Sequence, residues 1–276
     1  MPEMPEVETI CRSLRHHVEG KLIKEVEIRL PRLIKWPSPE DFRAIIVGRR
    51  IHRLERRAKY MLFDVTDGWV LVIHLRMTGR LFFRSADMPG EASARLVFHF
   101  SDGDALEYLD TRTLGTIYLL RENDLGRIYG LASLGPEPLS ADFTVTYMVA
   151  ELARKKAKIK TVLLDQRFIG GLGNIYVDES LALAGIHPER RANDLSEEEI
   201  ERLHAAVNQV IEKGICAGGT TFRDYRDADG NSGAFQEELC VYGRKGLPCP
   251  VCGAEIVRME VAGRGTHYCP QCQHKP

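Results

Sequence analysis

The sequence predicts an α+β protein built from several domains, and three observations favour this fold class. Short alternating apolar runs with hairpin turns between them follow an N-terminal helical segment and favour a β-sandwich. The apolar spacing becomes helical after the proline-containing segment 134–140. The C-terminal segment contains two Cys-x-x-Cys pairs. A chain of 276 residues is long enough for more than one core, and we expect domains at 1–133, 134–234 and 235–276.

The N-terminus combines a candidate nucleophile with a helix start. If Met1 is removed after synthesis, Pro2 has a free secondary amine; an α-amino group titrates near about 7.7–8.0, so part of it is neutral at physiological pH. A neutral amine can attack a carbonyl-level carbon and form an iminium ion, and Glu3 beside it can move protons. Pro5 suits the first turn of a helix, and Gly20 ends the helical run. The alternative is an ordinary N-terminus whose acidic residues only cap a helix.

The segments that follow have the two-residue period of strands. Asp67-Gly68 and Asp102-Gly103 are typical hairpin turns. We expect strands at 22–30, 59–66, 69–76, 80–84, 95–100, 105–110 and 116–120. Short strands of this kind behind one helix predict that the N-terminal domain is a β-sandwich.

Helical spacing dominates after the 134–140 linker. We expect helices at 143–156, 159–166, 174–184 and 196–213. Ser196 and Glu199 form a capping-box pattern at the start of the last helix. A glycine-rich turn at 170–173 precedes Asn174. Such a turn presents free backbone N–H groups at a helix start, where a phosphate binds readily.

The charge of the chain is nearly balanced, but its basic residues are clustered. The formal net charge of −1 does not by itself indicate nucleic-acid binding. Two clusters depart from this average: Arg49, Arg50, Arg53, Arg56, Arg57 and Lys59, and then Arg154, Lys155, Lys156, Lys158 and Lys160. Together they suit a phosphate-facing surface, whereas each alone equally fits a solvated charged face. Signal-peptide, transmembrane and lipidation patterns are absent from the sequence, and we expect a soluble cytoplasmic protein.

Four of the seven cysteines have the spacing of a zinc site. Cys249-x-x-Cys252 and Cys269-x-x-Cys272 are separated by sixteen residues, and each pair can present two thiolates on one turn of a hairpin. We therefore expect one structural Zn²⁺. Two disulfides are the alternative, which a reducing compartment disfavours.

Several motifs, in this order along the chain, resemble those of the formamidopyrimidine-DNA glycosylase family of bacterial base-excision enzymes. They are PEMPEVET at 2–9, RRAKY at 56–60, GLGNIYVDES at 171–180, VYGRKGLPCPVC at 241–252 and AGRGTHYCPQC at 262–272. The resemblance runs from end to end. It implies an N-terminal β-sandwich, a helix–two-turn–helix domain that contains the glycine-rich turn, and a C-terminal zinc hairpin. It also implies a monomer whose partner is damaged double-stranded DNA.

The resemblance implies a bifunctional DNA glycosylase and AP lyase that excises oxidised purines (8-oxoguanine and formamidopyrimidines). Family enzymes flip the damaged base out of the duplex because its target carbon is inaccessible in the stack. Pro2 would then attack C1′ of the sugar, and β- and δ-elimination would follow. By the family match, Glu3 is the acid–base group, Lys59 assists β-elimination and Arg264 assists δ-elimination. Taken alone, Lys59 would fit a surface lysine at a strand edge.

The family match also implies which side chains meet the DNA. Met77 would wedge into the gap left by the flipped base, and Asn174 would grip backbone phosphate. The positions matched to DNA contacts are Met77, Ser93, Arg112, Leu114, Lys155, Lys156, Lys160 and Asn174. The positions matched to recognition of the extruded base are Glu6 and, in a loop that closes over it, Thr220, Thr221, Phe222, Arg223 and Tyr225.

Two segments depart from the family pattern. The motif that is usually DVRKFG is DTRTLG at 110–115, so Leu114 replaces the wedging aromatic ring. Leucine still fills a gap between bases, but it loses stacking worth about 1–3 kcal/mol. The segment that is usually KHDH is ASAR at 92–95, so the phosphate contact expected at Ser93 lacks its usual residue. Both changes predict a shifted preference for the opposite base, with the chemistry unchanged.

Two other functions are compatible with the sequence. One is an endonuclease VIII-like glycosylase for oxidised pyrimidines; Met4 argues against it, since those relatives usually have glycine there. The other is a non-catalytic protein that binds abasic sites or gaps through Asn174 and the zinc hairpin. The joint presence of Pro2, Glu3, Lys59 and Arg264 favours catalysis.

Overall fold

The computed structural model describes residues 2–222 and 225–274. The chain forms two compact units. The first combines Met1–Ala132 with Ala217–Ala234, and the second combines Ser133–Cys216 with Phe235–Pro276. Segment 217–234, which follows the last predicted helix, therefore packs with the N-terminal part of the chain.

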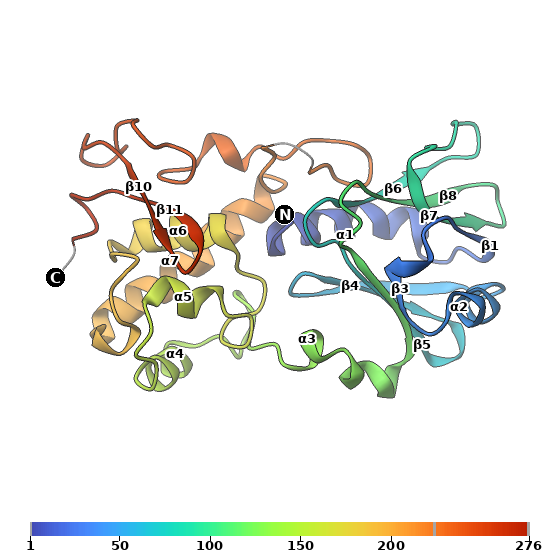
Figure 1. The fold of residues 1–276 in the computed structure, drawn as a ribbon, viewed down its shortest axis with the longest axis horizontal. Helices are drawn as coiled ribbons and strands as arrows, with labels where there is room; N and C mark the ends of the chain where they lie inside the picture. Colours follow the sequence, from blue (N-terminus) through green and yellow to red (C-terminus); the bar gives the residue numbers. More distant parts are fainter. Residues whose placement is uncertain (1, 223–224, 275–276) are drawn as a thin grey trace. The chain divides into compact units, whose positions relative to one another are not determined.

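The first unit is a β-sandwich, as the sequence predicts (Figure 1). Within the described part of the chain, one sheet has the strand order β1-β7-β8-β6 and the other has the order β2-β9-β5-β4-β3. β2 pairs parallel to β9, and the other neighbouring pairs are antiparallel. The strands are β1 (Ile23–Ile28), β2 (Ile34–Trp36), β3 (Ile51–Arg57), β4 (Tyr60–Val65), β5 (Trp69–His74), β6 (Gly79–Arg84), β7 (Ala94–Phe100), β8 (Ala105–Asp110) and β9 (Thr116–Arg121).

The core of this unit lies between the two sheets. Alternate side chains point inward along a strand, so Met61 and Phe63 of β4 share one hydrophobic cluster with Phe98 and Phe100 of β7. Helix α1 (Met4–Val18) adds one apolar face to this cluster and packs against β3, β4 and β6, so it contacts both sheets. The N-terminus of the chain is thereby attached to the core.

The elements that the sequence analysis did not predict include α2 (Pro39–Ile46) and β3. Only Ile51 and Leu54 of β3 are buried, and a register shift between Ile51 and Arg53 interrupts the alternation. The basic residues of β3 therefore interrupt the alternation of apolar and polar residues that would indicate a strand. In contrast, the predicted hairpin of β4 and β5 is present, with Asp67 and Gly68 at positive φ (64° and 69°) in its turn.

The second unit is mainly helical. Its helices are α4 (Val145–Leu152), α5 (Ile159–Leu164), α6 (Asn174–Ala184) and α7 (Glu197–Cys216), and α3 (Tyr129–Ala132) precedes it in the chain. α6 packs against α5, α7 and β11 (Arg264–Tyr268), which forms a hairpin with β10 (Val257–Val261). The capping box that opens α7 is present: Glu199 accepts the Ser196 N–H at 2.9 Å, and the Ser196 hydroxyl accepts the Glu199 N–H at 3.3 Å. No helix among the described residues is long and apolar enough to cross a membrane.

Helix α4 is shorter than the predicted span 143–156 and ends at Leu152. The chain then pairs with a distant segment: Lys158 forms a β-bridge with Arg191, and the Ile159 N–H donates to the Arg190 carbonyl at 2.7 Å. Within the predicted span, the Lys155 carbonyl accepts the Asn193 N–H at 3.1 Å, and no local spacing predicts this pairing.

Candidate active site

The N-terminal candidates are held at the start of α1. Pro2 is buried, and Glu3 is the N-cap residue of the helix. One carboxylate oxygen of Glu6 accepts the Glu3 N–H at 2.7 Å, and the other accepts the Thr220 N–H at 2.7 Å. A single buried carboxylate therefore connects the predicted nucleophile segment to the predicted base-recognition loop. Met1, whose removal would free the Pro2 amine, lies outside the described residues.

Lys59 lies in the turn between β3 and β4, where Ala58 adopts a positive φ of 50°. The side chain is buried, with 6% exposure, which the surface-lysine alternative does not explain. Burial lowers the pKa of the Lys59 ammonium, and the negative charges of Glu3 and Glu6 offset this only in part. The structure therefore brings Lys59 into the electrostatic range of both carboxylates, and its ammonium loses a proton more readily than that of an exposed lysine.

His74, at the end of β5, is a site residue that the sequence analysis missed. Burial, followed by the positive charges of Arg76 and Lys59, lowers the pKa of His74 to about 3, so the ring is neutral. Its Nδ1 accepts the Arg76 N–H at 3.0 Å, and the ring packs edge-on against Tyr60 at 4.6 Å. The available signal was its position in HLRM, three residues before Met77.

Two predicted wedge residues lie on neighbouring loops of the first unit. Met77 follows β5, and Leu114 follows β8; their side chains are 40% and 47% exposed although both are apolar. Arg112 is also exposed. Thr78 and Asp110 connect the two loops, because the Thr78 hydroxyl donates to Asp110 at 2.6 Å and accepts the Arg112 N–H at 3.1 Å. Ser93 precedes β7 and is exposed.

The predicted base-recognition loop packs on α1. The Tyr225 hydroxyl donates to the Gly218 carbonyl at 3.0 Å and lies 3.4 Å from the Glu6 carbonyl. Gly219 has a φ of 84°, and a Cβ there would lie 2.9 Å from the Glu6 side chain, so the approach requires glycine. The Thr221 hydroxyl accepts the Gly233 N–H at 3.0 Å. Phe222 is 52% exposed, and Arg223 lies outside the described residues.

The second unit brings Asn174, Lys160 and the Arg264 turn together. Asn174 opens α6, and its amide donates to the Gly265 carbonyl at 2.9 Å. The Lys160 ammonium bonds to Asp178 at 2.5 Å and lies 3.3 Å from the same Gly265 carbonyl. The carboxylate of Asp178 also accepts the His267 N–H at 2.9 Å. This network anchors the turn between β10 and β11.

Lys160 has surroundings that differ from the DNA-facing position implied by the family match. Its side chain is fully buried, and its charge is compensated by Asp178. Arg264 and Lys156 are exposed, and Lys155 is half-buried, with its ammonium above the Phe168 ring at 5.7 Å. A phosphate contact is therefore accessible to these other cations without loss of a buried ion pair, whereas Lys160 supports the Arg264 turn from below the surface.

The four predicted zinc ligands lie together at the C-terminal hairpin. The Sγ atoms of Cys249, Cys252, Cys269 and Cys272 all lie within 4.8 Å of one another. Two of the separations are 4.0 Å and 3.4 Å. A tetrahedral Zn²⁺ with Zn–S bonds of about 2.3 Å places its sulfur ligands about 3.8 Å apart. The cluster therefore fits one structural zinc ion.

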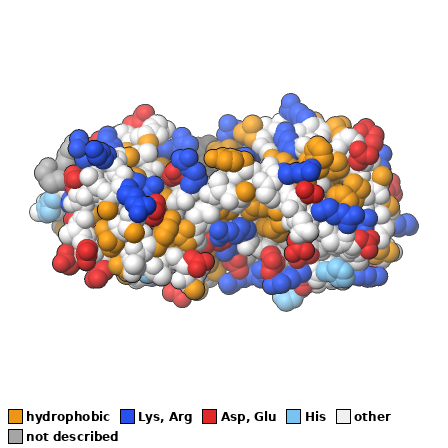
Figure 2. Space-filling view, turned by 90° about the horizontal axis from the view of Figure 1, so that it is seen from below, with side chains coloured by type: hydrophobic (Ala, Val, Ile, Leu, Met, Phe, Trp, Pro, Cys, Tyr) orange, Lys and Arg blue, Asp and Glu red, His pale blue; other side chains and the backbone are white. Residues whose placement is uncertain are grey.

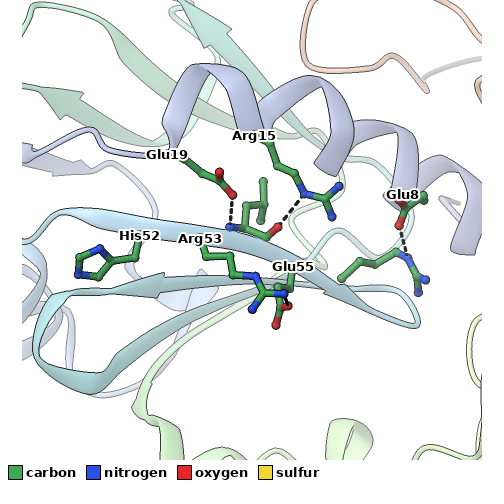
Figure 3. A pocket seen from close by; sticks show the side chains of 8 residues that line it. Glu8, Arg15, Glu19, His52, Arg53 and Glu55 are labelled. Atoms are coloured by element: carbon green, nitrogen blue, oxygen red, sulfur yellow. Dashed lines mark hydrogen bonds and ion pairs between the residues drawn. The ribbon is translucent and has the colours of Figure 1, made fainter.

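A separate open pocket of about 620 Å³ lies along α1 and β3 (Figure 3). Its charged side chains are engaged with one another and with the strand: Arg15 donates to the Leu54 carbonyl at 2.9 Å, and Glu19 accepts the Leu54 N–H at 2.8 Å. Glu8 pairs with Arg56 at 2.8 Å. The contacts of Arg15 and Glu19 satisfy the backbone N–H and carbonyl of Leu54 at the edge of β3. The residues that line the pocket thus stabilise the fold, and they do not include the predicted catalytic residues. Figure 2 shows Lys and Arg mixed with Asp and Glu on one face of the molecule, in line with the balanced charge.

Comparison with known proteins agrees with this geometry. Three family models match the chain: the formamidopyrimidine-DNA glycosylase N-terminal domain at 1–117, the formamidopyrimidine-DNA glycosylase H2TH domain at 134–226, and the zinc finger found in FPG and IleRS at 246–275. Curated formamidopyrimidine-DNA glycosylases from Desulforamulus reducens and Bacillus subtilis are 48% and 45% identical to it. The alignments cover 99% of both chains in the first case and 100% in the second.

Solved structures of the Lactococcus lactis enzyme have the same fold. One, a mutant in complex with Fapy-dG-containing DNA, superposes with a TM-score of 0.93 at 40% identity and covers 99% of this chain and 100% of its own. Others of that enzyme contain an abasic site or an oxidised pyrimidine in the DNA. The fold and the cysteine cluster thus define a zinc-finger DNA glycosylase of the DNA-repair class. The chain belongs to the formamidopyrimidine-DNA glycosylase family.

Proposed function

We propose that the protein is a bifunctional DNA glycosylase and AP lyase that excises oxidised purines, 8-oxoguanine and formamidopyrimidines, from duplex DNA. The observation that supports this most directly is the buried Lys59, which interacts with the charges of Glu3 and Glu6 and whose pKa is lowered by burial. A neutral amine at that place can accept a proton, as elimination at an abasic sugar requires. The Fapy-dG and abasic-site complexes of the Lactococcus lactis relative support the same substrates.

In the proposed reaction, the Pro2 nitrogen attacks C1′ of the damaged nucleotide, and the bond between C1′ and the base breaks with Glu3 as the acid–base group. The C1′–O4′ bond then breaks, a proton goes to O4′ and the sugar ring opens. This leaves an iminium ion between Pro2 and C1′, which acidifies the C2′ proton. Lys59 assists removal of that proton, and the 3′ phosphate leaves. Arg264 then assists departure of the 5′ phosphate, and water releases the sugar fragment from Pro2. Zn²⁺ takes no part in these steps, because the four cysteines fill its coordination sphere.

The proposed DNA contacts come from exposed or half-buried side chains in each unit. Lys155, Lys156 and Asn174 would hold phosphates, and Met77, Arg112 and Leu114 would fill the space left by the extruded base. Ser93 lies on an exposed segment and would meet the backbone. Because Leu114 is exposed and apolar, it suits insertion between bases, with an altered preference for the opposite base.

The base-recognition loop and Lys160 have supporting roles in the proposed function. Glu6, Thr220, Thr221, Phe222, Arg223 and Tyr225 would enclose the flipped base, and Lys160 would act by supporting the Arg264 turn. The protein would work as a monomer on damaged duplex DNA in the bacterial cytosol, as its bacterial relatives suggest.

Borohydride trapping on a duplex with 8-oxoguanine opposite cytosine tests this proposal. A covalent adduct that maps to a peptide beginning at Pro2 is the expected result. K59M is expected to lower strand cleavage, and K24M, which removes an exposed lysine of β1, is the matched control. Tight binding without any adduct, also on an abasic-site duplex, would favour the non-catalytic alternative.

A second substrate class follows from the comparisons. The Lactococcus lactis enzyme has been solved with DNA that contains an oxidised pyrimidine, so a duplex with thymine glycol belongs in the same assay. Faster excision of thymine glycol than of 8-oxoguanine would favour the endonuclease VIII-like alternative. Equal excision of 8-oxoguanine opposite each of the four bases would contradict the altered opposite-base preference.

A further inference from the structure

Two short loops of the β-sandwich have exposed side chains, although the residues at the ends of the loops are buried. The loop between β5 and β6 carries Met77, and its flanking residues Leu75 and Gly79 are buried. The loop between β8 and β9 carries Arg112 and Leu114. Exposed apolar side chains are unfavourable in water and often mark a binding site. Their positions relative to each other depend on the residues that hold the two loops at their base.

Asp110 lies at that base and is only 2% exposed. One carboxylate oxygen accepts the Thr78 hydroxyl at 2.6 Å and the Arg112 N–H at 3.2 Å. The other accepts the Gly115 N–H at 2.8 Å and the Tyr108 hydroxyl at 3.3 Å. One carboxylate thus binds donors from both loops and from its own strand.

Both loops pack closely against the Tyr108 side chain beside these hydrogen bonds. A Cβ at Gly115 would lie 1.7 Å from the Tyr108 hydroxyl oxygen, and a Cβ at Gly79 would lie 2.6 Å from the same atom. Both loops therefore close directly on Tyr108, and burial raises the pKa of Tyr108, so its hydroxyl stays protonated and donates. Gly79 and Asp110 are also partners in the register of β6 and β8.

A carboxylate is the side chain that this position requires. Ionised aspartate accepts hydrogen bonds with both oxygens and donates none, which matches the four donors around it. Asparagine has the same shape, but in either orientation its NH₂ group would face a backbone N–H, that of Arg112 or Gly115, which cannot accept a hydrogen bond. The D110N substitution therefore removes at least one hydrogen bond of the network while it preserves the volume.

We propose that Asp110 is a positioning residue that holds the Met77 loop and the Arg112–Leu114 loop as one insert, so that their side chains enter the DNA together when a base is extruded. This inference rests on the proposed function. It predicts that loss of the Asp110 carboxylate slows base extrusion and leaves the later elimination chemistry unchanged.

The test compares wild type with D110N and with D102N, which removes an exposed carboxylate elsewhere on the same sheet. A duplex with 2-aminopurine opposite 8-oxoguanine reports unstacking by stopped-flow fluorescence, and single-turnover excision is measured on the same duplex. D110N is expected to slow both by roughly tenfold or more, as for loss of a buried hydrogen bond to a charged group. Cleavage of a single-stranded abasic oligonucleotide, which has no opposite base to displace, is expected to change less than about twofold.

A double-mutant cycle separates positioning from a general structural effect. If the loops act as one insert, M77A should slow extrusion in wild type but add little in D110N. T78V removes one donor of the network and is expected to have a smaller effect of the same sign, which keeps the test decisive if D110N fails to fold.

Wild-type fluorescence kinetics in D110N, or an equal loss on the single-stranded abasic substrate, would overturn the inference. A wild-type protein that unstacks the opposite base but cleaves nothing would contradict the proposed function alone, since the extrusion measurements would still report on Asp110.

Discussion

Lys59 illustrates how a buried position changes the chemistry of an ordinary side chain. Lysine is rarely fully buried because its charged form loses hydration. Here the turn between β3 and β4 buries it, and burial lowers the pKa of its ammonium. The sequence analysis placed Lys59 in the site only through a family match, because nothing in RRAKY indicates burial.

Replacement of Lys59 by methionine should separate activity from stability. We expect K59M to lower strand cleavage by about 10²- to 10⁴-fold, the usual contribution of a general acid or base. The variant should still fold, with a lower free energy of unfolding at pH 7, because Glu3 and Glu6 lose the opposing charge of Lys59. Single-turnover cleavage and denaturant unfolding measure the two effects.

The pH dependence of the same variant has a definite sign. The unfolded chain binds a proton at Lys59 up to its ordinary pKa of 10.5, whereas the folded chain releases it at lower pH. Wild-type stability therefore rises with pH in that window relative to K59M. A stability difference between the two proteins that is constant up to pH 10 would contradict the lowered pKa.

His74 predicts a separate loss of stability in acid. Its pKa is about 3 in the folded protein and 6.5 without the fold, so between these values the unfolded chain binds more protons. Wild type should lose up to roughly 4 kcal/mol between pH 6.5 and pH 3 from this residue, at about 1.4 kcal/mol per pKa unit. H74Q should lose less over the same range, with H52Q, which changes an exposed histidine, as the control. Parallel unfolding curves for wild type and H74Q would exclude this linkage.

The strands and helices with a clear local period were predictable. β4 and β5 follow from alternation around an Asp-Gly turn, and α7 follows from its capping box. α2, β3 and the early end of α4 were not predicted. In β3, basic residues and a register shift obscure the two-residue period, although the strand pairs with the adjacent β4. After α4, the chain pairs with Arg191 instead of continuing the helix. The zinc cluster was predictable for the opposite reason: four cysteines at short spacing define a site by themselves.

The C-terminal hairpin should depend on its metal. Its apolar cluster is small and includes Cys249 and Cys269 themselves, so we expect zinc to supply much of the stability of this segment. We expect a strong chelator, or the C252S substitution, to abolish amide protection over residues 246–275 while the β-sandwich keeps its protection. C216S, which changes an exposed cysteine outside the cluster, should leave protection unchanged. Hydrogen exchange with mass spectrometry and zinc quantification measure this, and a fully protected hairpin in metal-free protein would contradict it.

The balanced charge of the whole molecule has a consequence for how it binds DNA. With a net charge of −1, long-range attraction to a polyanion is weak, so affinity depends on local basic groups. We expect K155A and K156A each to lower the slope of log K against log salt by about one, equally on damaged and undamaged duplexes. Fluorescence anisotropy over a salt series measures the slope, with K213A as the control for an exposed lysine of α7. An unchanged slope in both variants would remove these lysines from the binding surface.

The surroundings of several site residues were not predictable from the sequence, because their partners lie outside the motifs that contain them. Asp110 binds Thr78, Lys160 binds Asp178, and the Glu6 carboxylate binds Thr220 across more than two hundred residues. Spacing within a motif does not report such pairs. The family match supplied the positions of these residues, and the structure supplied their surroundings.

The path of the chain between its two units also limits how the protein can be divided. Residues 217–234 belong to the first unit although both flanking segments belong to the second, and Tyr225 and Ala228 complete the hydrophobic cluster of the first unit. A fragment that ends at residue 132 would therefore leave part of its core facing water. A protease that cut only near residue 133 would leave the units joined by two further chain connections, at residues 216–217 and 234–235. Domain exchange with a relative would have to transplant the inserted segment together with the sandwich that it completes.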